Sequence, residues 1–200
     1  MRRLLIATNN KGKVLEIQDL LAGLGLVLFI PADLGIHLEV QEDGLSYAEN
    51  AAKKAVAFAE ASGLVSLADD SGLEVDALGG RPGLHSNRFG PQPGTDATRR
   101  RYLLDQLRDK HRPWTARFRA TVAIAGPDHE TKIASGECEG EIIPEERGTG
   151  GFGYDPIFLL TAQGQTMAEL GMAEKNRLSH RARAVLNSIP ILEKILKEKE

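Results

Sequence analysis

Two adjacent carboxylates, Asp69 and Asp70, interrupt the stretch SLADDSGLEVD at residues 66–76, where a short apolar run meets Ser71 and Gly72. Neighbouring residues of a strand point to opposite faces, so the two aspartates are not expected to chelate one ion together. One would face a binding site while the other supports the backbone or a neighbour. A single such carboxylate suits Mg²⁺, which takes one or two protein carboxylates and leaves its other positions to water and substrate phosphates. The alternative is an ordinary turn, because Asp, Ser and Gly are all turn residues.

A lysine-containing turn in ATNNKGK, residues 7–13, is a candidate phosphate site. It follows an aliphatic run that predicts a buried strand, and it precedes residues with helical spacing. Open α/β sheets bind ligands at this edge, and a helix N-terminus there offers backbone N–H groups to an anion. Lys11 and Lys13 add positive charge, although the P-loop pattern G-x-x-x-x-G-K-[ST] is absent. The alternative is a solvated turn whose asparagines cap the helix.

The segment GTGGFGYDP, residues 148–156, combines four glycines with two aromatic residues, Phe152 and Tyr154. Glycines let a backbone approach a ligand closely, and an aromatic ring among them can stack on a base. A mobile loop with its rings packed in the core explains the composition almost as well.

Basic residues gather in EKNRLSHRARAV, residues 174–185. Such a cluster can bind phosphate or the oxygens of a base, and the alternative is a solvated helix face. Its members are Lys175, Arg177, His180, Arg181 and Arg183.

The elements that must position these residues alternate between strands and helices. We expect strands at 4–8, 26–30, 64–68, 116–124, 131–143 and 157–160. The clearest helix lies between Ser46, which stands in capping-box spacing with Glu49, and Gly63. Further helices are expected over 14–24, from near Thr95 with an exposed Arg99, Arg100 and Arg101, and over 179–197 with a break at Pro190. This order predicts an α/β protein with a mixed sheet.

Composition places limits on partners and compartment. The 200 residues, 42% of them hydrophobic, are enough for one domain spanning 1–200. A net charge of -3 lacks the basic excess of a nucleic-acid binder, and no segment approaches the roughly 18 apolar residues of a membrane span. We therefore expect neither a nucleic-acid nor a membrane partner. Cys138 is the only cysteine, which fits a reducing, cytoplasmic setting.

Taken together, five motifs resemble those of the inosine triphosphate pyrophosphatase family and stand in the same order. They are TNNKGK, SYAENAAKKA, LADDSGLEVDALGGRPG, GTGGFGYDPIF and EKNRLSHRARA, which extend from Thr8 to Ala184. The resemblance implies a long mixed sheet flanked by helices, in two lobes with a central cleft. It also implies a homodimeric, Mg²⁺-dependent enzyme that converts the triphosphates of inosine, deoxyinosine or xanthosine into the monophosphate and pyrophosphate.

The resemblance also assigns roles to individual residues. Asp70 would be the metal ligand and general base, and Lys13 would neutralise charge on the phosphates. Glu42 would be the second acidic metal ligand, with Gln41 where relatives often carry a glutamate. The substrate-binding residues would be Thr8, Asn9, Asn10, Lys11, Gly12, Lys13, Ser71, Phe152, Gly153, Tyr154, Asp155, Lys175, His180 and Arg181.

Two other functions fit parts of the pattern. One is a pyrophosphatase acting on modified pyrimidine or methylated guanine triphosphates. The other is a nucleotide- or RNA-binding module without chemistry, which would gain nothing from the carboxylates of DDSG.

Overall fold

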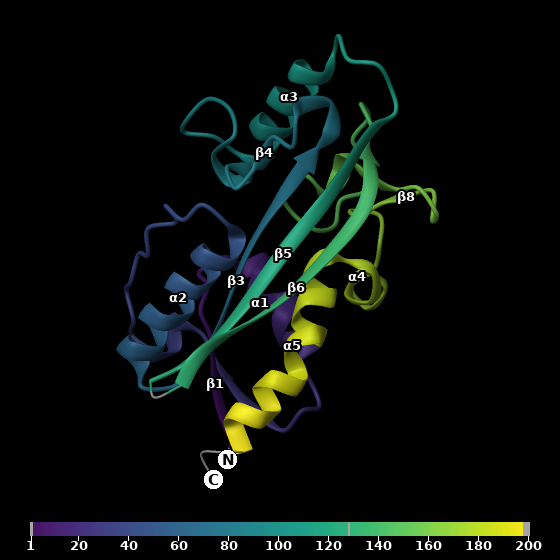
Figure 1. Cartoon of the computed structure of the whole chain (residues 1–200). Helices are drawn as coiled ribbons and strands as arrows, with labels where there is room; N and C mark the ends of the chain where they lie inside the picture. The colour runs from purple at the N-terminus through teal and green to yellow at the C-terminus, as the bar shows by residue number, and fades with distance from the viewer. Residues whose placement is uncertain (1, 128, 198–200) are drawn as a thin grey trace. The chain divides into compact units, whose positions relative to one another are not determined.

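The computed structural model describes residues 2–127 and 129–197, and these residues form two compact units. Unit 1 takes in the chain up to Asp70, Ala120–Gly136 and the residues from His180 onward. Unit 2 comprises Ser71–Arg119 and Glu137–Ser179. Figure 1 traces the chain through both units.

The strands of the described residues pair into one eight-stranded mixed sheet, in the order β2-β1-β3-β5-β6-β7-β8, with β4 paired to β3. β1 runs parallel to both β2 and β3, whereas β4 is antiparallel to β3 and β7 is antiparallel to β6 and β8. The expected α/β class with a mixed sheet is confirmed. The strands are β1 Arg2–Ile6, β2 Leu26–Phe29, β3 Val65–Val75, β4 Pro82–Gly83, β5 Trp114–Gly126, β6 His129–Ile142, β7 Phe158–Leu160 and β8 Gln165–Thr166.

The helices follow local signals where those signals are strong. The Ser46 side chain caps α2 by accepting the Glu49 N–H, and the helix ends at Gly63 with a φ of 67°, as the sequence predicts. No helix in the described part of the chain has both the length and the apolar character to cross a membrane. The α-helices are α1 Lys11–Leu20, α2 Tyr47–Ser62, α3 Asp96–Leu107, α4 Met172–Leu178 and α5 His180–Lys197. Within the described residues, four short 3-10 turns lie at Pro31–Leu34, Asp76–Leu78, Ser86–Arg88 and Asp155–Ile157.

Unit 1 buries both faces of its strands. Along β1, Leu4 and Ile6 pack with residues of α1 and α5, whereas Leu5 packs with residues of α2. Figure 1 shows α2 and α5 on opposite sides of these strands. The alternation follows from the two-residue period of a strand, and it also determines which side of β3 each polar residue faces.

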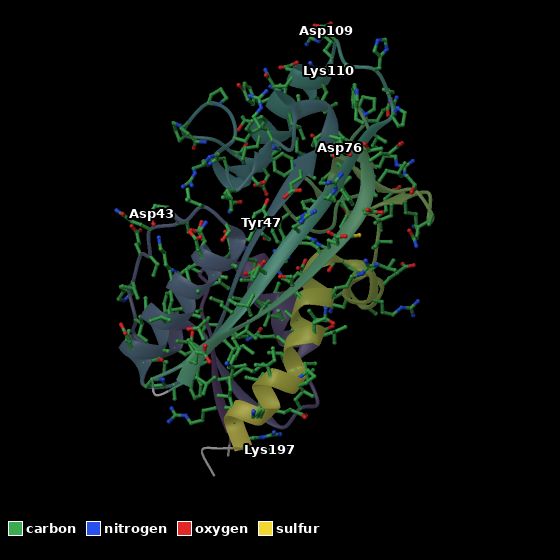
Figure 2. The ribbon with its side chains drawn as sticks, in the orientation of Figure 1. Asp43, Tyr47, Asp76, Asp109, Lys110 and Lys197 are labelled. Carbon is green, nitrogen blue, oxygen red and sulfur yellow. The ribbon has the colours of Figure 1, made fainter. Side chains whose placement is uncertain are left out.

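Unit 2 has its own core, built from the second half of β3, α3 and the strands that follow. Leu103 and Leu107 of α3 lie in it together with Tyr154 and Phe158. Asp76, labelled in Figure 2, comes directly after β3. The core anchors α3 next to the glycine-rich segment at 148–156.

The central strand β3 is longer than expected. We predicted that it would end at Asp69 or turn at the DDSG segment, but it continues without a break from Val65 to Val75. Pairing with β1 at Leu67 and with β4 at Leu73 holds the segment extended. Tertiary pairing thus overrides the turn preference of Asp, Ser and Gly.

The last helices differ from the expectation in two ways. Helix α5 runs without a break through Pro190, which lies on its exposed side, where water can replace the hydrogen bond that proline removes. The short helix α4 was not predicted at all.

Candidate active site

The turn between β1 and α1 in unit 1 begins the site. Asn10 caps α1, because its Oδ1 accepts the Lys13 N–H at 3.1 Å, and the Thr8 hydroxyl accepts the Asn10 N–H at 3.2 Å. The capping interpretation of these side chains therefore holds. No acidic residue lies in the first turn of α1, which leaves the positive end of its dipole available to an anion.

A buried cluster of charges lies beside this turn. The Lys13 ammonium is 3.1 Å from Asp69 Oδ2, and its side chain is only 8% exposed. Arg181 of α5 donates from Nε to the same oxygen at 3.1 Å and from Nη1 to Glu16 Oε2 at 2.5 Å. Burial raises the pKa of Asp69, but Lys13, Arg181 and Lys54 together hold it well below its usual range. Burial lowers the pKa of Lys13, while Asp69 opposes that effect.

Asp70 has a different set of partners. Asn50 of α2 donates from Nδ2 to Asp70 Oδ2 at 3.0 Å, and the Lys54 ammonium is 3.8 Å from Asp70 Oδ1. Lys54 also binds Glu42 Oε1 at 2.5 Å and the Asp69 carbonyl oxygen at 2.6 Å. The two aspartates therefore serve different neighbours, as the alternation of a strand predicts.

The electrostatic environment of Asp70 suits a base. Burial raises its pKa above the usual value, and the nearby negative charge of Glu42 raises it further, while Lys54 opposes both effects. A carboxylate with a raised pKa accepts a proton more readily than an ordinary aspartate does.

The acidic residues present fit a magnesium ion. The carboxylates of Asp70 and Glu42 both lie within 4 Å of the Lys54 ammonium, so the two acidic side chains are close to the same point in unit 1. Among the described residues, no group of three or more His, Cys, Asp or Glu side chains gathers as a metal site. Two carboxylate donors suit Mg²⁺, which keeps water and substrate oxygens in its remaining positions.

In unit 2, Asp155 organises the glycine-rich loop. Its Oδ2 accepts the Phe152 N–H at 2.9 Å and the Lys175 ammonium at 2.7 Å. The Lys175 ammonium also lies 5.1 Å from the centre of the Phe152 ring. A Cβ at Gly151, where φ is 70°, would come within 2.1 Å of Asp155 Oδ2, so only glycine fits there.

Tyr154 belongs to the core of unit 2. Its ring is buried, and its hydroxyl donates to the Ser86 carbonyl oxygen at 2.9 Å, while burial raises its pKa. The alternative interpretation of this segment, with rings packed in the core, therefore holds for Tyr154. Phe152 is only partly buried and lies beside Lys175.

Comparison with known proteins identifies the family. Residues 4–190 match the model of the Ham1 family. The chain belongs to the Ham1 family. Two relatives are the dITP/XTP pyrophosphatases of Desulforamulus reducens and Bacillus subtilis, which are 47% and 42% identical to it and align over 96% of this chain and 96% and 98% of their own. A HAM1 protein from Coxiella burnetii has a similar structure, with a TM-score of 0.85, 36% identity and coverage of 99% of this chain and 100% of that one. The resemblance inferred from the five motifs is thus confirmed.

In this Ham1 protein the predicted residues fall into two groups. Unit 1 holds the turn residues Thr8, Asn9, Asn10, Lys11 and Gly12 together with Lys13, Glu42, Asp70, His180 and Arg181. His180 and Arg181 open α5 and are both buried. Unit 2 holds Ser71, Phe152, Gly153, Tyr154, Asp155 and Lys175.

Sequence reasoning missed three residues of the unit 1 group and misjudged two arginines. Asn50 and Lys54 are four residues apart on α2, which puts them on one helix face, and that spacing was the available signal. Glu16 had no comparable signal, because its partner Arg181 is 165 residues away in sequence. Arg99 and Arg100 were expected on an exposed face, but their side chains are only 16% and 12% exposed.

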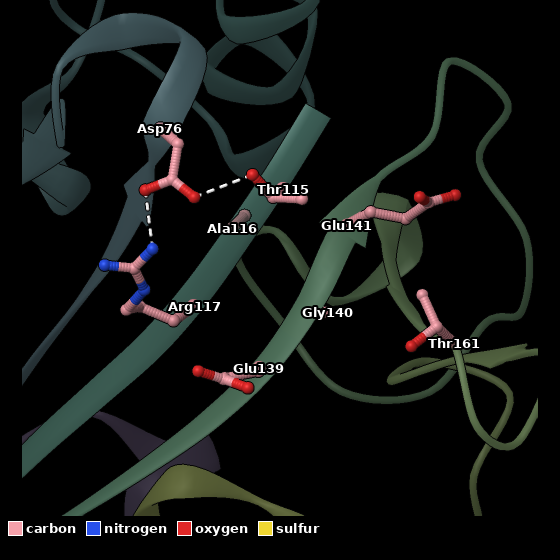
Figure 3. A pocket seen from close by; sticks show the side chains of 8 residues that line it. All are labelled: Asp76, Thr115, Ala116, Arg117, Glu139, Gly140, Glu141 and Thr161. Atoms are coloured by element: carbon pink, nitrogen blue, oxygen red, sulfur yellow. Dashed lines mark hydrogen bonds and ion pairs between the residues drawn. The ribbon is translucent and has the colours of Figure 1, made fainter. Parts of the chain in front are cut away.

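A separate hollow of about 330 Å³ lies in unit 2 over β5 and β6 (Figure 3). Asp76 at its edge accepts hydrogen bonds from the Thr115 hydroxyl at 2.7 Å and from Arg117 Nη2 at 2.5 Å. None of the predicted site residues lines this hollow, so it does not belong to the candidate active site.

Proposed function

We propose that this Ham1 protein hydrolyses the non-standard purine nucleoside triphosphates of inosine, deoxyinosine and xanthosine to the monophosphate and pyrophosphate. The observation that carries the proposal is Asp70, a buried carboxylate of raised pKa next to the Lys54 ammonium and the charge of Glu42. Two relatives that align with nearly the whole chain are named dITP/XTP pyrophosphatase, and this supports the substrate class. The chain would act as a hydrolase of phosphoanhydride bonds.

The residues of unit 1 suit the phosphate end of the substrate. Lys13 and the N-terminus of α1 would bind phosphate oxygens, with Lys13 held in place by Asp69. Asp70 would take the proton of a water whose oxygen attacks the α-phosphorus. The bond from that phosphorus to the bridging oxygen then breaks, and pyrophosphate leaves with the electron pair.

A magnesium ion would be held by Asp70 and Glu42. When bound, it supplies positive charge that neutralises the phosphate oxygens. It would compete with the Lys54 ammonium, which in this structure binds Glu42 and lies near Asp70.

The residues of unit 2 suit the nucleoside. Phe152, Asp155 and Lys175 form one cluster, joined by hydrogen bonds and a cation–π contact, that would hold the base, with Ser71 also contacting substrate. Donors such as His180 and Arg181 of unit 1 would favour a 6-oxo purine over adenine, because an adenine amino group would leave a buried donor unpaired. Arg181 would do so while bound to Asp69 and Glu16.

We also propose that residues 1–200 act as a single domain, and that the protein works in the cytoplasm as a homodimer with Mg²⁺.

The test is a substrate panel with product identification. The purified protein is incubated with Mg²⁺ and inosine, xanthosine, guanosine and adenosine triphosphates, and with a modified pyrimidine triphosphate. We expect pyrophosphate and the monophosphate from the first two, with little product from the others. Orthophosphate as the product, a pyrimidine preference or no turnover would each overturn the proposal.

Lys54 should support the reaction through Asp70. Replacing it in a Lys54→Met variant removes a cation that binds Glu42 and lowers the pKa of Asp70, so that pKa should rise further. We expect kcat/KM to fall by about tenfold at the acidic end of the series, where more of the Asp70 carboxyl is protonated, and to change much less at neutral pH, where Asp70 stays ionised and Lys54 no longer competes with the magnesium ion. Rates across a pH series measure both effects.

Lys53→Met is the matched control, since Lys53 is the adjacent residue of α2 and pairs with the exposed Asp43. It should retain wild-type rates. Equal losses in the two variants would mean that the effect comes from α2 in general and not from Asp70.

A further inference from the structure

We propose that Asp96 and Arg100 of α3 are positioning residues that hold the nucleoside-binding loop, residues 148–155, by both polar groups of the Gly153 backbone. The inference rests on the function proposed for the loop, and it adds two residues that no motif in the sequence marks. Both belong to unit 2, as does the whole loop.

Two side chains of one helix grip Gly153. Its N–H donates to Asp96 Oδ2 at 2.7 Å, and its carbonyl oxygen accepts from Arg100 Nη1 at 2.8 Å. The two residues are four apart in α3, which places them on the same helix face. A rigid helix therefore satisfies both hydrogen-bonding groups of one loop residue.

Arg100 also binds Glu146, two residues before the loop. Its Nε and Nη2 donate to the two carboxylate oxygens of Glu146 at 2.9 and 2.8 Å, a bidentate pair. One guanidinium thus joins Glu146 to Gly153, with Gly148, Gly150 and Gly151 between them in the sequence. Because its side chain is only 12% exposed, these bonds are partly protected from water.

The charges on α3 strengthen this grip. Burial raises the pKa of Asp96, but the Gly153 N–H and Arg99, which forms an ion pair with Asp96, lower it below the usual value. Hydrogen bonding to Arg100 lowers the pKa of Glu146. Both carboxylates are therefore ionised at neutral pH, and the bonds they accept are charge-assisted.

The loop needs external support because of its composition. Gly148, Gly151 and Gly153 all have positive φ, at 80°, 70° and 61°, and glycines lose the most conformational freedom on ordering. Phe152 lies between two fixed points. Asp155 binds its N–H, while Asp96 and Arg100 hold the residue that follows it. Releasing Gly153 should loosen the Phe152 ring and its neighbour Lys175.

The variant Arg100→Met tests the inference with three measurements. We expect hydrogen exchange of the amides at 150–155, followed without nucleotide, to become about tenfold faster. We expect the KM for inosine triphosphate and the Kd for inosine monophosphate to rise by about tenfold, with a much smaller change in kcat. If Arg100 only stabilised unit 2, its replacement would lower the melting temperature, but it would not raise KM and Kd while leaving kcat nearly unchanged.

Arg108→Met is the control, because Arg108 lies at the end of the same helix and is exposed in a pair with Asp105. It should change none of these quantities. Arg100→Lys should restore part of the loss, since an ammonium can still donate to the Gly153 carbonyl oxygen but cannot form the bidentate pair. It also serves as the test if Arg100→Met fails to fold.

Unchanged exchange at 150–155 in the folded variant would overturn the inference, and so would faster exchange with unchanged Kd and KM. The exchange and monophosphate-binding measurements do not depend on turnover. If the wild-type protein binds inosine monophosphate but does not hydrolyse the triphosphate, the proposed reaction is contradicted. Hydrogen exchange and monophosphate binding then still decide the role of Arg100.

Discussion

Replacing Asp70 with asparagine should abolish turnover while the protein stays folded. The variant keeps the size of the side chain and an oxygen that can accept from Asn50, but it loses the base and one of the two acidic metal ligands. Loss of a general base alone costs about a hundred- to ten-thousandfold in rate. We therefore expect kcat to fall by at least about a hundredfold on inosine triphosphate.

The same change should not lower stability. The raised pKa of Asp70 means that the fold disfavours its ionised form relative to the unfolded chain, so removing the charge relieves that cost at neutral pH. The melting temperature should stay at or above the wild-type value. A large loss of kcat together with an unchanged or higher melting temperature would show that Asp70 has a chemical role and not a structural one.

The control for Asp70→Asn is Asp105→Asn, which changes an exposed aspartate that pairs with Arg108 at the end of α3. It should retain wild-type kcat and KM. Near wild-type turnover by Asp70→Asn would refute the assignment of the base. A binding module without chemistry would tolerate Asp70→Asn, and its affinity for inosine triphosphate would be nearly unaffected by that substitution.

Asp69→Asn should be strongly destabilising, in contrast to the change at the next residue. Asp69 is the buried carboxylate that neutralises both Lys13 and Arg181. Removing one partner of a buried ion pair typically costs about 3–5 kcal/mol, because the remaining charges stay buried without compensation. We expect a loss of this order in the free energy of unfolding at neutral pH, measured by urea denaturation.

The pH dependence of this loss has a definite sign. The pKa of Asp69 in the folded protein is held well below the value of about 3.9 found in unfolded chains. Its contribution to stability is therefore complete above that unfolded value and is lost as the pH falls through the folded pKa. The difference in unfolding free energy between wild type and Asp69→Asn should be constant near neutral pH and should shrink below about pH 4.

Asp43→Asn is the matched control, because Asp43 is exposed and pairs with Lys53 at the surface. Exposed pairs contribute little, so its unfolding curve should coincide with that of the wild type. If Asp69→Asn unfolds at the same urea concentration as the control, the buried cluster does not hold unit 1 together as described.

The sequence by itself determined the local parts of this protein. Ser46 and Gly63 mark the ends of α2 because capping depends only on nearby backbone groups, and Asn10 caps α1 for the same reason. Alternating strands and helices indicated the α/β class, since the period of hydrophobic residues is a local property. The order of five motifs was enough to indicate the Ham1 family, because a shared sequence pattern needs no coordinates.

Only the tertiary structure decided how the charged groups pair. Whether DDSG turns or continues as a strand depends on its pairing with β1 and β4, which local preferences do not encode. Asp69 binds Arg181, a residue 112 positions away, and Arg100 reaches Gly153 across 53 positions. From sequence alone an arginine is predicted to be an exposed charge. Its partner is known only once the fold brings distant segments together. For that reason candidate site residues such as Asp70 and Lys13 could be named from the sequence, whereas the contact of Arg100 with Gly153 could not.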